Sequence, residues 1–175
     1  MNSTFQGLEI RLAEDTDASA EILEAAASAG AAEGRPSWSP GSFTGSQGPG
    51  ISRLRSDLEI KGLYLVWVGD RPVATFSLLE SDALYWPAAA DDALYLHRFA
   101  VRRHAAGVGR QAVEWAVGEA LRRGREYIRL DCLAENRGIR RYYERCGFAA
   151  VDETVIDEVR FSLYEMRVTA DASLR

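Results

Sequence analysis

The feature that most constrains the fold is a short apolar run that leads directly into a glycine turn and a helical pattern. Residues 94–101 read Leu-Tyr-Leu-His-Arg-Phe-Ala-Val, without glycine or proline, which is typical of a strand buried on both faces. After a break at residues 102–106 the spacing of apolar residues becomes helical, and Gly124 stands where a helix should end. The apolar side of this helix carries Val113, Ala116, Val117, Ala120 and Leu121.

Gly107 and Gly109 lie where the strand gives way to the helix. The first turn of a helix leaves backbone N–H groups without partners, and the helix dipole adds partial positive charge there. Glycine lets a phosphate approach the main chain closely. The turn is therefore a candidate anion site, although a Gly-x-Gly pair also occurs as a plain tight turn.

A second strand and helix follow this helix. Residues 125–133 are strand-like, and Asn136 begins a helix that ends at Gly147. The apolar side of this second helix carries Ile139, Tyr142, Tyr143 and Cys146. The order of strand, glycine turn, helix, strand and helix predicts a right-handed crossover with a parallel pair of strands.

These segments together resemble the GNAT superfamily of acyl-CoA-dependent N-acyltransferases. The resemblance is carried by Tyr-Leu-His-Arg-Phe-Ala-Val, by Gly-Val-Gly-Arg at the helix start, and by Asn136 followed by Arg-Tyr-Tyr-Glu-Arg-Cys-Gly-Phe. It implies an α/β (α+β) fold with a mixed twisted sheet of about seven strands, about four flanking helices, and splayed fourth and fifth strands. A Rossmann dinucleotide site would need a third glycine where Ala112 stands.

The resemblance also implies an acyl donor site for acetyl-CoA, with no metal. The pantetheine arm would pair with the main chain around Phe99, Ala100 and Val101, and the pyrophosphate would lie on the amides of the glycine turn. The turn residues concerned are His104, Ala105, Ala106, Gly107, Val108, Gly109 and Arg110. Asn136 would be a further donor-binding residue. The chain departs from the family where His104 replaces an arginine or glutamine, and its loop before Gly107 is shorter than usual.

Two catalytic residues follow from the same resemblance. A free thiol has a pKa of about 8.5, so a departing thiolate is helped by an acid, and Tyr143 occupies the position of the family's catalytic tyrosine. Asp131 is at a strand position where some relatives carry the general base. A main-chain N–H near Phe99 would support the oxyanion. The alternatives are that Tyr143 is a core residue and that Asp131 pairs with Arg129 or a neighbour.

Other residues give weaker signals for acceptor binding. Glu80 and His97 are further candidates for the base, although a histidine in an apolar strand is more often a core residue. A cationic or aromatic amine would fit the aromatic and acidic residues of two loops, which are Trp38, Phe43, Trp86, Glu80, Asp91 and Asp92. The first of these loops, residues 34–50, is either a mobile surface segment or a flap over the acceptor.

The remaining elements complete a single domain, residues 1–175, with its core in residues 8–168. We expect strands at residues 8–12, 63–68, 73–79, 149–154 and 159–168. We expect a helix from Asp17 to about residue 29, with Gly30 and Gly34 as stops, and another at residues 51–61. Residues 81–92 should form a loop, and the tail from residue 169 should fray.

Composition narrows the class of protein. The chain has 175 residues, 47% of them hydrophobic and 27% charged, which is ordinary for one globular domain. The sequence shows no run of about twenty apolar residues and no basic-then-apolar leader pattern, so we expect a cytoplasmic protein without a membrane partner. The net charge of −5 argues against a nucleic-acid partner, whereas Arg102, Arg103 and Arg110 form a local basic group suited to a small polyanion. Cys132 and Cys146 are expected to be small core residues.

The leading hypothesis is thus an N-acyltransferase, most simply an N-acetyltransferase, that acts on an amine of a small molecule or peptide. A coenzyme A sensor without catalytic activity remains an alternative because of the altered loop. So does an acyltransferase that takes its acyl group from a carrier protein. The last strands could also pair two chains into a homodimer.

Overall fold

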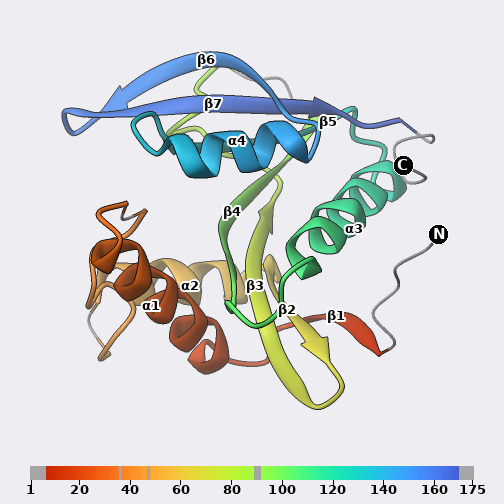
Figure 1. Ribbon diagram of the computed structural model, residues 1–175. Coiled ribbons are helices and arrows are strands. Elements are labelled where there is room, and N and C mark those ends of the chain that lie inside the picture. Colours follow the sequence, from red (N-terminus) through yellow and green to blue (C-terminus); the bar gives the residue numbers. More distant parts are fainter. Residues whose placement is uncertain (1–6, 36, 47, 89–91, 170–175) are drawn as a thin grey trace. The chain divides into compact units, whose positions relative to one another are not determined.

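The computed structural model describes residues 7–35, 37–46, 48–88 and 92–169. The described strands form one mixed sheet in the order β1-β2-β3-β4-β5-β7-β6, which confirms the predicted seven strands and four helices (Figure 1). The elements are β1 (Leu8–Leu12), α1 (Asp17–Ala32), α2 (Pro49–Glu59), β2 (Leu63–Val68), β3 (Arg71–Leu79), β4 (Ala93–Val101), α3 (Val108–Arg122), β5 (Tyr127–Leu133), α4 (Arg137–Arg145), β6 (Ala149–Ile156) and β7 (Val159–Arg167).

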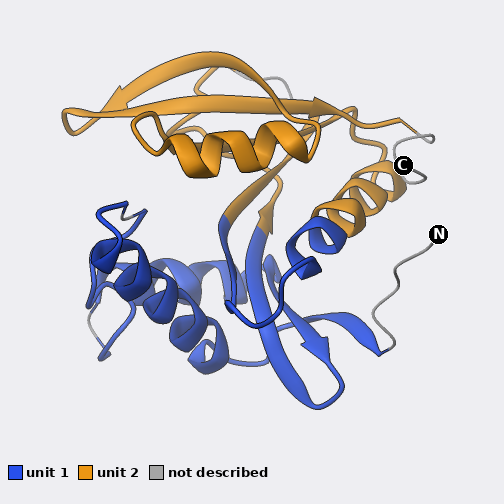
Figure 2. Ribbon diagram, viewed as in Figure 1, with its two compact units in different colours: residues 1–77, 98–112 blue, residues 78–97, 113–175 orange. Residues whose placement is uncertain are grey.

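The chain divides into two compact units, shown in different colours in Figure 2. Unit 1 comprises residues 1–77 and 98–112, and unit 2 comprises residues 78–97 and 113–175. Three elements, β3, β4 and α3, each contribute residues to both units. None of the described helices is long and apolar enough to cross a membrane.

Unit 1 packs α1 and α2 against the meander of β1, β2 and β3. Its core includes Leu23, Leu54 and Phe43, which are at most 4% exposed. Glu24 of α1 accepts hydrogen bonds from the amides of Gly41 and Phe43 at 2.7 and 3.1 Å, so part of the predicted loop is fastened to α1. The same loop contains Trp38, which packs edge-on against Phe43.

Two element boundaries in unit 1 differ from the sequence prediction. Helix α1 continues through Gly30 to Ala32, because a single glycine inside a helix costs only about 1 kcal/mol and tertiary packing can exceed that cost. Gly34, with φ of +67°, provides the left-handed turn after the helix end. Helix α2 begins at Pro49 rather than at Ile51, since proline is well suited to a first helical turn.

Unit 2 is built on β5, which pairs with β4 on one side and with β7 on the other. The β4–β5 pair is parallel, as predicted, and the long β6–β7 hairpin is antiparallel. Tyr164 of β7 is fully buried between these elements and α4. Cys132 is buried and Cys146 is half-buried, and the two cysteines form no disulfide. Residues 170–175 of the predicted tail lie outside the described residues.

The parallel pairing of β4 with β5 is short. Its register runs from Ala93 opposite Tyr127 to Tyr95 opposite Arg129, and then stops although both strands continue. Beyond this point no backbone pairing joins the described residues of the two strands. This is the splay of the fourth and fifth strands that the family resemblance implied.

Candidate active site

The glycine turn between β4 and α3 offers unused backbone donors. Ala105 donates its amide to the carbonyl of Arg102 at 2.9 Å, and Val108 donates to Ala105 at 3.2 Å. The amides of His104, Ala106 and Gly107 donate to no backbone carbonyl of the described residues. Because the first turn of α3 also leaves N–H groups without helical partners, the turn presents a run of donors suited to an anion.

Gly107 shapes this turn, since its φ of +93° is a conformation that side-chain-bearing residues rarely adopt. Ala105 and Val108 are buried, so their side chains anchor the turn in the core. The predicted cofactor residues of β4 have mixed exposure, with Ala100 buried and Phe99 and Val101 half-buried. All of these residues belong to unit 1.

The predicted basic group is partly neutralised within unit 1. Arg102 donates to the carbonyl of Pro72 at 3.1 Å and pairs with Glu21 at 2.8 Å, while Arg103 pairs with Glu33. These arginines therefore have glutamate partners on or just after α1.

Strand β4 is locally distorted at Arg98, whose φ is +48°. Its guanidinium Nε donates to Asp57 Oδ2 at 2.7 Å, and Nη2 forms an ion pair with the same oxygen. Ser77 also donates to Asp57, so a buried carboxylate of α2 receives donors from both strands. The cost of a left-handed non-glycine residue, of order 1–3 kcal/mol, is offset by this pairing, which fixes the backbone next to Phe99.

Asn136 and Tyr143 belong to unit 2. The Asn136 side-chain oxygen caps α4 by accepting from the amide of Ile139 at 3.2 Å, which confirms the predicted helix start. Tyr143 is 6% exposed and packs against Phe148 and Tyr164. Burial raises the pKa of Tyr143 well above its usual value, so the phenol keeps its proton at neutral pH.

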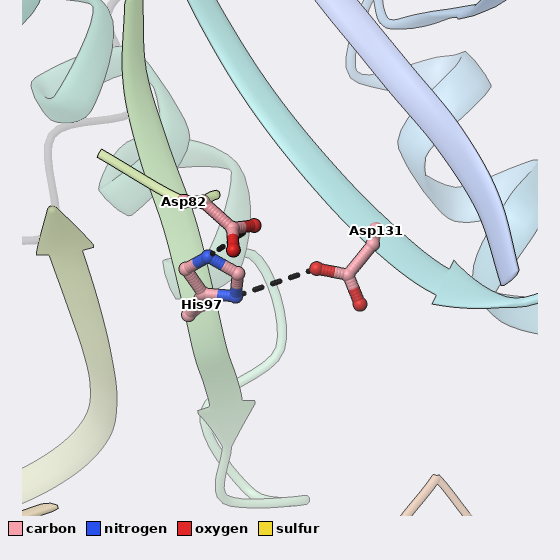
Figure 3. Close-up of side chains that lie close together, drawn as sticks. All are labelled: Asp82, His97 and Asp131. Carbon is pink, nitrogen blue, oxygen red and sulfur yellow. Dashed lines mark ion pairs between the residues drawn. The ribbon is translucent and has the colours of Figure 1, made fainter. Parts of the chain in front are cut away.

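Asp131 pairs with His97 rather than with Arg129. His97 lies between two carboxylates, with Nδ1 3.4 Å from Asp131 Oδ1 and Nε2 3.1 Å from Asp82 Oδ2 (Figure 3). The three side chains are only 9–12% exposed. We call Asp82, His97 and Asp131 the histidine cluster, and all three residues belong to unit 2.

Arg129 instead has other partners. It pairs with Asp92 and Glu165 at 2.7 Å each, and its guanidinium lies over the ring of Trp86 at 5.2 Å. Glu80 is held by Arg123 and Arg125. Several acids and aromatics that were considered for acceptor binding thus have internal partners, and Asp91 lies outside the described residues.

Sequence reasoning missed Asp82. It lies in the loop after β3, and its type and neighbours give no pattern that links it to His97. Its Oδ1 accepts from the amide of Tyr85 at 3.4 Å, while its Oδ2 is buried and accepts no hydrogen bond from the described residues. Only the fold brings this carboxylate to the ring of His97.

A mixed sheet with a parallel pair that separates, and a donor-rich glycine turn after the fourth strand, define a class of acyl-CoA-binding transferases. The model of the Acetyltransferase (GNAT) family matches residues 36–148. The chain belongs to this family and is an acyl-CoA-dependent acetyltransferase.

Individual relatives agree with this family. The chain is 29% identical over 133 residues to YesJ of Bacillus subtilis (strain 168), described as an uncharacterised N-acetyltransferase, and this covers 71% of the chain and 72% of YesJ. A GNAT-family acetyltransferase from Listeria monocytogenes has a similar structure, with a TM-score of 0.71, 22% identity, and coverage of 91% of this chain and 94% of that one. An acetyltransferase from Bacillus subtilis, solved in complex with CoA, has a TM-score of 0.62, 17% identity, and coverage of 93% and 99%.

Proposed function

We propose that the chain transfers an acetyl group from acetyl-CoA to an amine of a small molecule or peptide. The observation that carries the proposal is the run of unused amides at His104, Ala106 and Gly107 ahead of α3. These amides would bind the pyrophosphate, with Ala105, Val108, Gly109 and Arg110 completing the turn. The main chain of Phe99, Ala100 and Val101 would hold the pantetheine arm.

The chemistry needs an amine that attacks the thioester carbonyl and a thiolate that leaves. Tyr143 is proposed as the acid that protonates the departing sulfur, because the family resemblance gives it the position of the catalytic tyrosine. Asp131 is proposed as part of the base that receives the proton of the amine. Asn136 is proposed as a donor-binding residue in addition to its capping role, and an N–H near Phe99 as the oxyanion donor.

Two measurements test this function together. Release of free thiol from acetyl-CoA should depend on added amine when a panel of primary amines, amino acids and lysine-containing peptides is assayed. Calorimetry should show that acetyl-CoA binds. Binding without turnover across the panel would favour a coenzyme A sensor, and no binding at all would refute both functions.

A pair of glycine variants makes the binding test specific. Gly107→Ala places a Cβ on a residue with φ of +93° inside the turn, and Gly124→Ala does the same at φ of +67° after α3. The backbone cost is about 1–2 kcal/mol at Gly124, whose φ lies in the left-handed region, and at least as large at Gly107. Only Gly107→Ala should weaken acetyl-CoA binding, by about tenfold, because only it disturbs amides that face the phosphates. Equal affinity in the two variants would refute the phosphate site.

A further inference from the structure

Helix α4 carries the proposed acid, Tyr143, but has little apolar packing of its own. It lies along the β6–β7 hairpin (Figure 1), and among its described side chains only Tyr143 is buried. The helix has 9 residues, and isolated helices of fewer than about 12 residues are marginal in water. One buried ring can hold a helix against a sheet without fixing its rotation about its own axis. A further contact is therefore needed to set the direction in which Tyr143 points.

Tyr164 of β7 makes that contact. It is fully buried, and its strand pairs it with Leu130 of β5 on one side and with Ala150 of β6 on the other. The Tyr164 hydroxyl accepts a hydrogen bond from Arg140 Nε at 3.1 Å and donates one to Glu144 Oε1 at 2.9 Å. One hydroxyl thus joins two side chains of α4 to a strand that is held on both sides.

The two hydrogen bonds are placed to fix rotation. Arg140 and Glu144 are four residues apart, so they lie one above the other on the same face of α4. A single bond would act as a pivot, whereas two bonds about one turn apart to the same fixed atom do not allow the helix to roll. Tyr143 lies beside this pair, with its ring centroid 6.4 Å from that of Tyr164.

Both partners of the hydroxyl are charged at neutral pH. Hydrogen bonds with a charged partner are roughly twice as strong as neutral ones, and a hydroxyl that accepts from a cation and donates to an anion is polarised in one direction. Burial raises the pKa of Tyr164, and the hydrogen bond from Arg140 only partly opposes this. The hydroxyl therefore keeps the proton that it donates to Glu144.

The first turn of α4 is fastened separately. The Asn136 side chain accepts from the amide of Ile139 at 3.2 Å, and the Asn136 amide donates to the carbonyl of Leu133 at 3.0 Å. Loss of the Tyr164 hydroxyl should therefore disturb the later part of the helix, where Tyr143 lies, more than it disturbs Asn136.

We infer that the Tyr164 hydroxyl is a positioning group for acetyl transfer, because it fixes the rotation of α4 and with it the direction of the Tyr143 phenol. The inference rests on the proposed function, in which Tyr143 protonates the departing sulfur, and deepens it. Tyr164 itself exchanges no proton with the substrate. The Tyr143 hydroxyl stands at the end of a long side chain, so a small roll of α4 displaces it, and a misplacement of about 1 Å can lower a rate by about 100-fold.

Tyr164→Phe provides the first test, since it keeps the ring that packs on Tyr143 and removes only the hydroxyl. We expect kcat to fall by about tenfold or more. KM for acetyl-CoA should change by less than about twofold, because the lost interaction orients the acid and does not bind the donor. The matched control is Tyr95→Phe, which removes another buried hydroxyl that accepts from an arginine, Arg129, at 3.4 Å. This control should keep the kcat of the parent enzyme.

A double variant separates positioning from a general loss of stability. Tyr143→Phe removes the proton donor whose direction matters, so adding Tyr164→Phe to it should lower kcat by less than about twofold further. A merely structural hydroxyl would lower kcat by the same factor with and without the Tyr143 phenol. Equal factors in the two backgrounds would overturn the inference.

Glu144 allows the same hydrogen bonds to be broken from outside the core, since its side chain is exposed. Glu144→Ala should lower kcat by about threefold or more, whereas Glu144→Gln keeps an acceptor for the Tyr164 hydroxyl and should restore most of the rate. Parent rates in both variants would show that the bond to Glu144 does not orient α4. This pair keeps the inference open to refutation even if circular dichroism shows that Tyr164→Phe does not fold.

Amide hydrogen exchange of the whole protein gives a readout that needs no turnover. The amides of residues 137–145 should exchange faster in Tyr164→Phe than in the parent or in Tyr95→Phe. Parent kcat and parent exchange in Tyr164→Phe would overturn the inference and leave acetyl transfer intact. Absence of turnover with every amine would refute the proposed function, and the catalytic role of Tyr164 would fall with it even if α4 exchanged faster.

Discussion

His97 and Arg98 are neighbours on β4, yet their partners differ: Arg98 contacts one buried carboxylate, that of Asp57, and His97 contacts two partly buried ones, those of Asp82 and Asp131. Arg98 of unit 1 carries a guanidinium that remains charged at every accessible pH, so its pair with Asp57 is permanent. His97 of unit 2 instead carries an imidazole that lies between two carboxylates, those of Asp82 and Asp131. The first cluster holds the backbone at Arg98, and the second links β4, β5 and the loop after β3 within unit 2.

The largest expected change in stability comes from removing the carboxylate of Asp57 in unit 1. Asp57→Asn leaves the largely buried guanidinium of Arg98 without its counter-ion, and breaking such a pair costs about 3–5 kcal/mol in the free energy of unfolding. Urea denaturation measures the loss. The exposed Asp152→Asn should change stability by no more than about 0.5 kcal/mol. A similarly small change for Asp57→Asn would mean that the Arg98–Asp57 pair contributes little to the stability of the fold.

Tyr143→Phe tests whether the phenol of Tyr143 in unit 2 acts as a proton donor in the reaction. Removing the phenolic proton donor should lower the rate of thiol release by about 100-fold, a change of about 2.7 kcal/mol in the activation barrier. The thermal midpoint should hold, because the ring contacts with Phe148 and Tyr164 remain. If the rate were unchanged, Tyr143 would be a core residue, and its assignment as the acid would be wrong.

Gly50→Ala tests how tightly the core of unit 1 is packed around Phe43. A Cβ at Gly50 would lie 2.5 Å from the Phe43 ring and 2.7 Å from the Ser42 carbonyl oxygen, so we expect a loss of about 1–3 kcal/mol. The matched control is Gly118→Ala in α3, where nothing lies within 4 Å of the new atom. That exposed helical site should gain about 0.5–1 kcal/mol. Thermal melting of both variants decides whether the signs differ.

The smallest effect comes from charges on the surface of α3. A hydrogen bond from Arg122, opposed by partial burial and assisted by Arg123, lowers the pKa of Glu119. A lowered folded-state pKa adds stability above the ordinary value of about 4.5, and this stability is lost as pH falls through the lowered value. We expect less than about 1 kcal/mol, since the Arg122 side chain is 70% exposed and solvent screens its charge. Glu119→Gln should flatten the decline of unfolding free energy with pH in that acidic range, and an unchanged slope would contradict the assignment.

Much of the fold could be predicted from the sequence because the relevant signals are local. The apolar run of β4, the helical spacing after Gly109 and the start of α4 at Asn136 each depend on neighbouring residues, and the structure has all three. Boundaries shifted where packing outweighs a local preference, as at Gly30 within α1. The catalytic and donor-binding assignments stay predictions, which the variants above would test.

The sequence by itself determined the order of strands and helices and the glycine turn, since hydrophobic spacing and backbone preference act over a few residues. Tertiary structure alone decided which charges meet. Asp57 is far from Arg98 along the chain, and Asp82 lies in a loop whose pattern does not point to His97. A charge selects its partner by distance in space, and that distance exists only once the strands have paired.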